Sequence, residues 1–262
     1  KQTAYRVWLS EIMLQQTQVS TVIPYFDKFI KKYQTISDLA NADIDEILKL
    51  WEGLGYYSRA RNLHKTALIV SSDLAGRFPK TVNGLMALPG IGRSTAGAIL
   101  SLAFQIPTPI LDGNVKRVLT RYHAITGWPG DTKTEKKLWA FAEKYTPSVQ
   151  IRNYTQAIMD LGATLCKRST PSCSKCPLSS CCVAYNEAIV SKFPEKKVKK
   201  VKQQDLHLCV IKNNENEVVL AKREAKGIWG GLWCFPEKAD DASVRTLLNS
   251  IGIGKAQEIK EL

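Results

Sequence analysis

The chain has 262 residues, and 44% of them are hydrophobic, which is enough for the cores of one or two globular domains. Its longest largely apolar run, Ala96–Phe104, falls short of the ~20 residues that a helix needs to cross a bilayer, so no membrane span is predicted. The formal net charge of +13 favours a polyanionic partner such as nucleic acid, because basic side chains that neutralise phosphates release counterions.

The first predicted element is a helix over Trp8–Val19 with a mostly apolar surface. Glu11 interrupts that surface, and Gln15 and Gln18 follow at positions i+4 and i+7, on the same face. A solvated polar stripe would explain this pattern. The wall of a cleft would explain it as well, and there a partly desolvated carboxyl with a raised pKa could donate a proton near neutrality.

Four further helices are predicted before residue 90, because apolar residues recur there with helical spacing between short Gly, Pro, Asn or Asp segments. They cover Ile23–Tyr33, Ile44–Trp51, Ala60–Leu74 and Val82–Leu88. No sustained alternation of apolar and polar residues occurs in residues 1–165. This part of the chain is therefore expected to be nearly all helix.

Two adjacent tyrosines, Tyr56 and Tyr57, follow a Gly-Leu-Gly segment and precede two arginines. Aromatic side chains in such a loop could wedge a duplex open or stack on a base. Packing between helices explains the tyrosines as well, and on this pair alone it is the simpler interpretation.

A Pro-Gly-x-Gly turn joins two helical patterns within Leu88–Ala98. Its two glycines permit a tight turn and the close approach of another molecule's backbone. The helix after the turn starts with serine and threonine, and its free N–H groups would favour an anion. The arrangement is typical of a helix-hairpin-helix that grips a DNA phosphate without reading bases. An ordinary corner between two helices would have the same pattern.

Asp112 stands immediately before a predicted amphipathic helix. Aspartate is a preferred N-cap and could be there for the helix alone. The helix N–H donors would also keep its carboxylate ionised, which predicts a low pKa beside a raised one at Glu11. Two carboxyl groups with opposed pKa shifts suit the cleavage of a glycosidic bond, since one supplies a proton and the other faces the developing sugar cation.

Four cysteines fall within 17 residues, at Cys166, Cys173, Cys176 and Cys182. Disulfides are not expected, because the sequence shows no secretory signal. The spacing suits a structural zinc ion and equally a [4Fe–4S] cluster, and it does not choose between them. Cys181 could replace Cys182 as the fourth ligand.

Six lysines and few large apolar residues predict an exposed basic linker over residues 190–204. A second domain is expected from residue 205, where β-prone segments at Leu206–Ile211 and Val218–Arg223 flank a polar turn and predict a hairpin. The chain opens at Lys1 and leaves only 58 residues for this second domain, so we expect it to be a piece of a longer protein.

Five segments, in order, resemble the adenine DNA glycosylases that act on A/G mismatches (the MutY type), within the endonuclease III-like, helix-hairpin-helix superfamily. They are Trp-Leu-Ser-Glu-Ile-Met-Leu-Gln-Gln-Thr-Gln-Val from residue 8, Gly-Leu-Gly-Tyr-Tyr from residue 53, Leu-Pro-Gly-Ile-Gly-Arg-Ser-Thr-Ala-Gly from residue 88, Ile-Leu-Asp-Gly-Asn-Val-Lys-Arg from residue 110, and the cysteine loop. The resemblance runs from Tyr5 to about Cys182 and resumes from Leu206 to Pro236.

The resemblance implies a mainly α fold. Residues 1–189 would form a helix-hairpin-helix DNA glycosylase domain, with DNA in a cleft between a six-helix barrel and a lobe that bears an iron–sulfur cluster loop. Residues 205–262 would form a partial α+β Nudix-like domain. The target adenine would be flipped out of the duplex. Glu11 would protonate adenine at N7, Asp112 would stabilise the developing sugar cation, and Asn114 would help to position these groups.

The implied partner is double-stranded DNA with adenine opposite 8-oxoguanine or guanine, bound by a monomer in the nucleoid of a bacterium or in the nucleus or mitochondrion of a eukaryote. Residues expected to contact this DNA are Gln15, Gln16, Tyr56, Gly90, Gly92, Ser94, Thr95, Lys116 and Arg117. By the same resemblance, Cys166, Cys173, Cys176 and Cys182 would hold a [4Fe–4S] cluster.

Ser94 departs from the bifunctional relatives, which carry there a lysine that forms a Schiff base with the abasic sugar. A serine implies base excision with little or no strand cleavage.

The run Gly227–Pro236 resembles the module that these enzymes use to recognise 8-oxoguanine. The acidic helix of active Nudix hydrolases is missing from Phe235–Leu262, so no pyrophosphatase activity is expected. The rival interpretations are a pyrimidine-damage glycosylase with lyase activity and a non-catalytic DNA-binding module.

Overall fold

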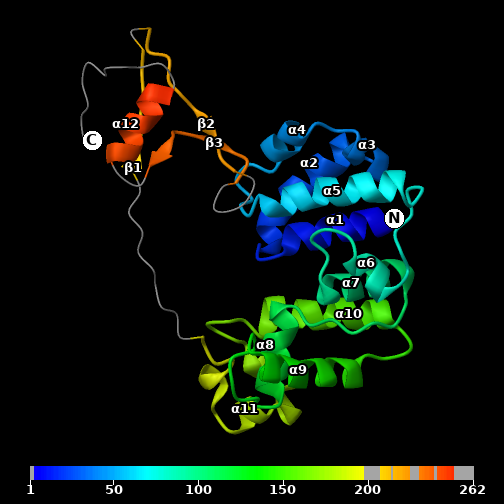
Figure 1. The fold of residues 1–262 in the computed structure, drawn as a ribbon. Helices are drawn as coiled ribbons and strands as arrows, with labels where there is room; N and C mark the ends of the chain where they lie inside the picture. Colours follow the sequence, from blue (N-terminus) through cyan, green and yellow to red (C-terminus); the bar gives the residue numbers. More distant parts are fainter. Residues whose placement is uncertain (1–2, 198–206, 214, 225–229, 239–240, 251–262) are drawn as a thin grey trace. The chain divides into compact units, whose positions relative to one another are not determined.

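The computed structural model describes residues 3–197, 207–213, 215–224, 230–238 and 241–250. The chain divides into two compact units, Lys1–Lys197 and Val198–Leu262. The described part of the first unit consists of helices joined by short turns (Figure 1). No helix in the described part of the chain is long and apolar enough to span a membrane.

The first half of this unit contains α1 (Ala4–Leu14), α2 (Val19–Lys32), α3 (Ile36–Ala40), α4 (Ile44–Leu50), α5 (Ser58–Ser72), α6 (Val82–Met86) and α7 (Arg93–Ile99). Helix α7 continues directly into a π-helical turn, η1 (Leu100–Phe104). The second half contains α8 (Gly113–Tyr122), α9 (Thr132–Tyr145), α10 (Ile151–Asp160), the π-helical turn η2 (Leu161–Leu165) and α11 (Val183–Asn186). Three short 3₁₀ turns complete it, η3 (Cys173–Lys175), η4 (Ser179–Cys181) and η5 (Val190–Lys192).

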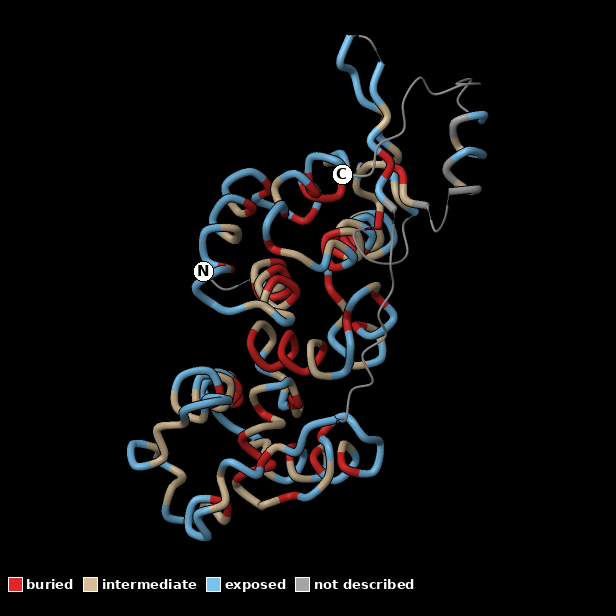
Figure 2. The backbone as a smooth tube through the Cα atoms, turned by 90° about the vertical axis from the view of Figure 1, so that its left-hand side faces the viewer, coloured by how far each residue is buried: buried red, intermediate tan, exposed pale blue. Residues whose placement is uncertain are grey.

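Helix α1 lies in the core of the first unit. Trp8 and Leu9 are completely buried, and Ile12 and Met13 on the next turn are buried as well. The helix packs against α2, α5, α7 and η1, and α1 is among the helices that carry many buried residues, red in Figure 2. Full burial of side chains of this size contributes about 1.5–3 kcal/mol each, so most of the surface of α1 has to be apolar.

The predicted helix over Trp8–Val19 is wrong at its C-terminal end. Helix α1 ends at Leu14, and Gln16 has a left-handed backbone with a φ of 59°. Gln18 is the N-cap of α2 and does not continue the polar face of α1. Val19, expected on the apolar face, is 54% exposed.

The cause of this early end is a contact distant in sequence. Arg59, on α5, donates hydrogen bonds to the carbonyl oxygens of Ile12 and Met13. These carbonyl groups lie in the last turn of α1, where no N–H of the helix is available to them. The guanidinium therefore caps the helix where the periodicity of the sequence would let it continue.

The four helices predicted between residues 23 and 88 are confirmed, with differences at their ends. Helices α4 and α6 begin at the predicted residues, α5 begins two residues earlier, and α2 begins at Val19. Side chains of Thr35, Asp43 and Thr81 accept hydrogen bonds from N–H groups in the first turns of α3, α4 and α6. Such caps are local signals that a sequence can show.

The second unit contains the predicted hairpin. Lys212 pairs with Val218 in antiparallel orientation, and the Val219 N–H donates to the Ile211 carbonyl oxygen. Leu206 and residues 227–229 of the glycine-rich run lie outside the described residues. The strands and helix are β1 (His207–Leu208) paired antiparallel with β4 (Glu237–Lys238), β2 (Ala221–Lys222) paired antiparallel with β3 (Trp233–Cys234), and α12 (Asp241–Ser250).

The prediction of an exposed linker over residues 190–204 is wrong at Phe193, which is only 7% exposed. Arg121 Nε donates to the Phe193 carbonyl oxygen at 2.9 Å. The Lys197 ammonium lies 4.9 Å from the centre of the Trp128 ring. An apolar anchor among the lysines therefore fixes this segment to the first unit. Residues 198–204 of the predicted linker lie outside the described residues.

Gly97 lets α7 lie directly against the segment that leads to Asp112. A Cβ atom at Gly97 would lie 2.3 Å from the Pro109 carbonyl oxygen, so no other residue fits without a backbone shift. We expect Gly97→Ala to lower the free energy of unfolding by about 1–3 kcal/mol through overpacking. Chemical denaturation measures this difference.

Gly113→Ala is the matched control, because a Cβ atom at Gly113 would have no heavy atom within 4 Å. Its free energy of unfolding should stay within about 0.5 kcal/mol of the wild-type value. Equal stability of the two variants would contradict the close packing of α7 on Pro109.

Candidate active site

Glu11 is a half-buried carboxyl group on the largely apolar helix α1. Burial, and next the negative charge of Asp112, raise its pKa to about 7. A carboxyl with this pKa keeps its proton in about half of the molecules at neutral pH. Of the two interpretations of the sequence, the direction of this pKa shift favours the desolvated carboxyl over the solvated stripe.

Asp112 is the N-cap of α8, as its position in the sequence predicts, and its Oδ1 accepts a hydrogen bond from the Val115 N–H at 2.8 Å. The predicted low pKa is wrong. Burial raises the pKa of Asp112 and outweighs the lowering by the N–H groups of Val115 and Asn114 and by the charges of Arg117 and Lys116. Because the charge of Asp112 raises the pKa of Glu11, we take Asp112 to be the carboxyl that ionises first.

Asn114 lies in the first turn of α8, and its Oδ1 accepts a hydrogen bond from Arg117 Nη2 at 2.8 Å. The same guanidinium donates to the carbonyl oxygens of Cys166 and Gly162, each at 2.6 Å. Arg117, predicted to contact DNA, therefore has its donors directed to groups of the chain itself. It connects the start of α8 to the cysteine loop.

The first turn of α7 and the turn before it contact both elements that carry a carboxyl group. Ser94 Oγ accepts the N–H of Leu111, next to Asp112, at 3.0 Å. Gln15, at the end of α1, donates through Nε2 to Thr95 Oγ1 at 3.3 Å and to the Gly90 carbonyl oxygen at 3.2 Å. Two of the expected DNA contacts, Ser94 and Thr95, thus hold the site together in this structure.

The glycines of this turn adopt the geometry that the turn requires. Gly90 has a φ of 79°, in the left-handed region that side chains disfavour, and a Cβ atom there would lie 3.0 Å from Asn62 Cβ. Gly92 is the extended N-cap of α7. The Pro-Gly-x-Gly turn is therefore a helix–turn–helix junction with its second helix beginning at Arg93.

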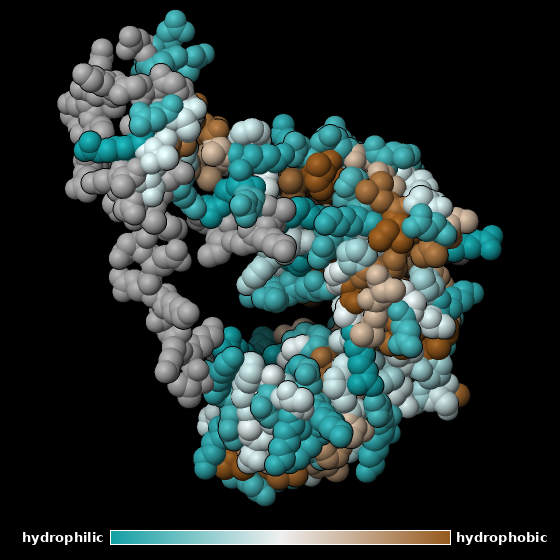
Figure 3. Space-filling model, viewed as in Figure 1, coloured by the Kyte–Doolittle hydropathy of each residue, from teal (hydrophilic) through white to brown (hydrophobic). Residues whose placement is uncertain are grey.

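Of the other expected DNA contacts, Tyr56 is 58% exposed and Gln16 is exposed as well. Lys116 Nζ lies 2.5 Å from Glu135 Oε1 in an ion pair. Figure 3 shows a hollow between the part of the first unit that carries α1–α5 and the part that carries α8–α11, bordered largely by hydrophilic side chains.

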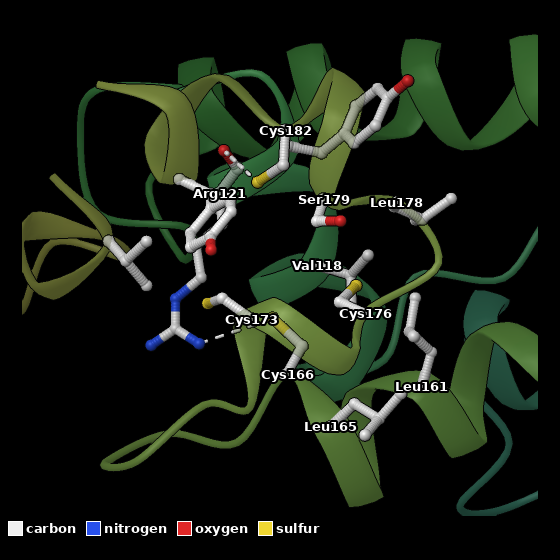
Figure 4. A pocket seen from close by; sticks show the side chains of 13 residues that line it. Val118, Arg121, Leu161, Leu165, Cys166, Cys173, Cys176, Leu178, Ser179 and Cys182 are labelled. Carbon is white, nitrogen blue, oxygen red and sulfur yellow. Dashed lines mark hydrogen bonds between the residues drawn. The ribbon is translucent and has the colours of Figure 1, made fainter. Parts of the chain in front are cut away.

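The four predicted cysteine ligands line one cavity with about 420 Å³ of empty space, open solvent at its mouth included (Figure 4). Leu161, Leu165, Leu178 and Val118 form an apolar part of its wall. Cys181 does not line this cavity and is exposed. Between the two candidates for the fourth position, Cys182 is thus the one that faces the cavity.

The donor set of this cavity consists of four cysteine sulfurs, those of Cys166, Cys173, Cys176 and Cys182. Four thiolates suit a structural zinc ion and a [4Fe–4S] cluster. Burial and then the nearby thiols Cys166 and Cys182 raise the pKa of the Cys173 thiol, so a cationic group would favour its thiolate form.

Two arginines near these sites have no role in the sequence-based prediction. Arg59 is 7% exposed and caps α1, and Arg121 is 4% exposed and donates to Cys166 Sγ at 3.4 Å. Arg59 shares the buried face of α5 with Leu63 and Thr66. A charged residue in register with an apolar stripe is the signal that could have identified it.

The model of the HhH-GPD superfamily base excision DNA repair proteins matches residues 9–144, and the model of the NUDIX domain matches residues 207–261. The adenine DNA glycosylase of Buchnera aphidicola subsp. Schizaphis graminum is 45% identical over 257 residues, which are 97% of this chain and 74% of that protein. The adenine DNA glycosylase of Homo sapiens is 48% identical over 182 residues, which are 69% of this chain and 33% of that protein.

Among solved structures, a thermostable thymine-DNA glycosylase is similar with a TM-score of 0.64 and 31% sequence identity, over 71% of this chain and 86% of that one. A non-covalent endonuclease III–DNA complex has the same fold, with a TM-score of 0.62 over 72% of this chain and 87% of that one, at 24% identity. The chain therefore belongs to the HhH-GPD superfamily of base excision DNA repair proteins, and within it to the adenine DNA glycosylases.

Proposed function

We propose that the chain removes adenine opposite 8-oxoguanine or guanine from duplex DNA by hydrolysis of the N-glycosidic bond. One observation carries this proposal. Glu11 has a pKa of about 7 and lies within the electrostatic reach of a second carboxyl group, Asp112. One proton donor and one anion are the two groups that glycosidic cleavage requires.

In the proposed reaction, the adenine nucleotide is flipped out of the stack into the site. Protonated Glu11 transfers its proton to N7 of the base, and the bond between N9 and C1′ breaks with its electron pair going to the base. The carboxylate of Asp112 faces the positive charge that develops on the sugar. Water then adds to C1′ and loses a proton, which returns Glu11 to its protonated form.

The hydrophilic border of the hollow in the first unit supports a complex with duplex DNA there, and we propose that one chain forms this complex. The hairpin at Gly90 and Gly92 would contact a phosphate, and the exposed side chains of Tyr56 and Gln16 would contact the bases beside the flipped nucleotide. Lys116 could contact a phosphate only by exchanging its ion pair with Glu135.

A serine in place of a catalytic lysine supports excision without efficient strand cleavage. Strand cleavage through a Schiff base needs an amine as nucleophile. Ser94 has no amine, and its hydroxyl oxygen accepts the Leu111 N–H. The abasic sugar is therefore expected to leave the enzyme with its strand intact.

We further propose that Cys166, Cys173, Cys176 and Cys182 hold a [4Fe–4S] cluster. When bound, the cluster would cross-link the loop that contains all four cysteines. Arg121 supports this assignment, since its Nη1 donates to Cys166 Sγ at 3.4 Å and can offset negative charge on the thiolates. The apolar wall from Leu161 and Leu165 would shield the site from water.

In the second unit, we propose that the strands around Trp233 take part in recognition of 8-oxoguanine. The indole is 62% exposed, and the Lys222 ammonium lies 5.7 Å from its centre. An exposed aromatic ring beside a cation is suited to stacking on a base next to a phosphate.

Glu11→Gln tests the proposed proton donor. The amide cannot protonate adenine, so the single-turnover rate of adenine release opposite 8-oxoguanine should fall by about 10²–10⁴-fold. The dissociation constant for the same duplex should change little. Excision at the wild-type rate would show that Glu11 is not the acid.

Glu187→Gln is the control, because it removes the same charge from an exposed glutamate of the first unit. This variant is expected to excise adenine at the wild-type rate.

The same assay tests the rival interpretation. A wild-type chain that binds the duplex without releasing adenine would favour the non-catalytic binding module.

The raised pKa of Glu11 also predicts how stability depends on pH. The folded protein keeps this proton up to about pH 7, whereas the unfolded chain loses it near 4.5, so the folded state binds more protons between these values. The free energy of unfolding should fall as the pH rises through this range, by up to about 3 kcal/mol.

Denaturant unfolding of the wild type and Glu11→Gln measures this contribution. Well above pH 7 the variant should be the more stable protein, and the difference should disappear toward pH 4.5. A difference that does not change with pH would contradict the assigned pKa.

Cys182→Ser and Cys181→Ser together test the cluster ligands. The iron content and visible absorbance of the purified chain should fall in Cys182→Ser, because Cys182 lines the cavity. Both should be unchanged in Cys181→Ser, whose side chain is exposed. The reverse result would assign the fourth position to Cys181.

A further inference from the structure

Arg59 is a buried cation whose two terminal nitrogens face different segments of the site. Its Nη1 donates to the carbonyl oxygens of Ile12, Met13 and Gln15, at 3.1, 2.6 and 2.7 Å. These groups belong to the C-terminal end of α1, where helix carbonyls lack partners within the helix. Ile12 is the direct neighbour of Glu11, so this contact fixes the turn that carries the carboxyl group.

The other terminal nitrogen, Nη2, faces the loop that carries Tyr56. It donates to the carbonyl oxygens of Leu54 and Gly55, at 3.1 and 3.2 Å, and to Thr17 Oγ1 at 3.0 Å. The guanidinium carbon lies 5.5 Å from the centre of the Tyr56 ring. One planar group thus joins the end of α1 to this loop.

The loop needs such support because Tyr56 has a φ of 49°. This left-handed backbone is uncommon for a residue with a large side chain, and it persists where surrounding contacts hold it. Arg59 donates hydrogen bonds to the carbonyl oxygens of the two preceding residues and so stabilises the loop on its buried side, while the tyrosine ring itself is 58% exposed.

No ion pair of Arg59 with a carboxylate occurs in the described ranges of the chain. Its charge is instead balanced by the dipoles of five carbonyl groups and one hydroxyl group. A lysine has a single nitrogen and cannot face both segments at once. The geometry is therefore specific to a guanidinium.

We propose that Arg59 is a positioning residue for base excision, which holds the helix of the proton donor and the loop of the exposed tyrosine as one rigid unit. The inference rests on the proposed function, which gives Glu11 and Tyr56 their roles. Arg59 acts through these two residues and does not itself touch the substrate.

Arg59→Lys in the full chain, purified with its iron–sulfur cluster, tests this inference. With enzyme in excess over a duplex that carries adenine opposite 8-oxoguanine, the rate constant of excision should fall by about 10–100-fold, because small displacements of a catalytic group are costly. The fraction of active enzyme and the dissociation constant for the duplex should change little. A merely structural role would lower the active fraction and leave the rate constant of the active molecules unchanged, and that result would overturn the inference.

Arg152→Lys is the matched control. Arg152 is partly buried and donates to a backbone carbonyl oxygen, that of Leu102, at 2.7 Å, and this hydrogen bond joins α10 to η1 rather than α1 to the tyrosine loop. Its rate constant should equal the wild-type value. An equal loss in both variants would show that any arginine bonded to a backbone carbonyl group has this effect and would overturn the special role of Arg59.

A double variant tests the coupling to the tyrosine. The loss in Arg59→Lys combined with Tyr56→Leu should be smaller than the product of the two single losses, because both changes disturb one unit. Fully independent losses would overturn the coupling.

A second variant keeps the test possible should Arg59→Lys fail to fold. Thr17→Val removes one acceptor of the same guanidinium and should slow excision several-fold. A wild-type rate constant in this variant would overturn the inference.

The outcomes also separate this inference from the proposed function. Absence of adenine release by the wild-type chain contradicts the proposed function. Release by the wild type together with an unchanged rate constant in Arg59→Lys overturns the role of Arg59 alone.

Discussion

Burial of the Glu11 carboxyl on an apolar helix is the constraint on which the rest of the structure depends. Desolvation, with the charge of Asp112, raises the pKa of Glu11 to about 7, and each unit of pKa shift corresponds to about 1.4 kcal/mol. The fully buried neighbours Trp8 and Leu9 stabilise α1 in the core and so keep the carboxyl in this environment. The same packing that raises the pKa of Glu11 therefore makes the folded protein less stable at high pH.

Hydrogen bonds between elements distant in sequence set the positions of the two carboxyl groups. Ser94, in the first turn of α7, holds the segment before Asp112, and Gln15 connects the end of α1 to Gly90 in the turn before α7. Arg117 extends these contacts to the carbonyl oxygen of Cys166, at the start of the cysteine loop. A change in the hairpin or in the cysteine loop should therefore affect excision even where it leaves DNA binding intact.

The sequence predicted those features that depend on local rules. Helical periodicity located α2, α4, α5 and α6, and the N-cap preference of aspartate located Asp112 at the start of α8. Predictions of features that depend on tertiary contacts were wrong or stayed open. The end of α1 is set by Arg59, which lies 47 residues from Ile12, and burial reverses the pKa shift expected for Asp112. Spacing alone also left the nature of the cysteine site open, since four thiolates suit a zinc ion and a [4Fe–4S] cluster alike.

The most direct test of the central claim is single-turnover incubation of the chain with a duplex that carries adenine opposite 8-oxoguanine, analysed with and without hot alkali to cleave abasic sites. Proton donation by Glu11 and the absence of an amine at Ser94 predict released adenine, with strand breaks only after alkali. Strand breaks without alkali would contradict the assignment of Ser94. Bound duplex without released adenine would contradict the assignment of Glu11 and Asp112 as the catalytic pair.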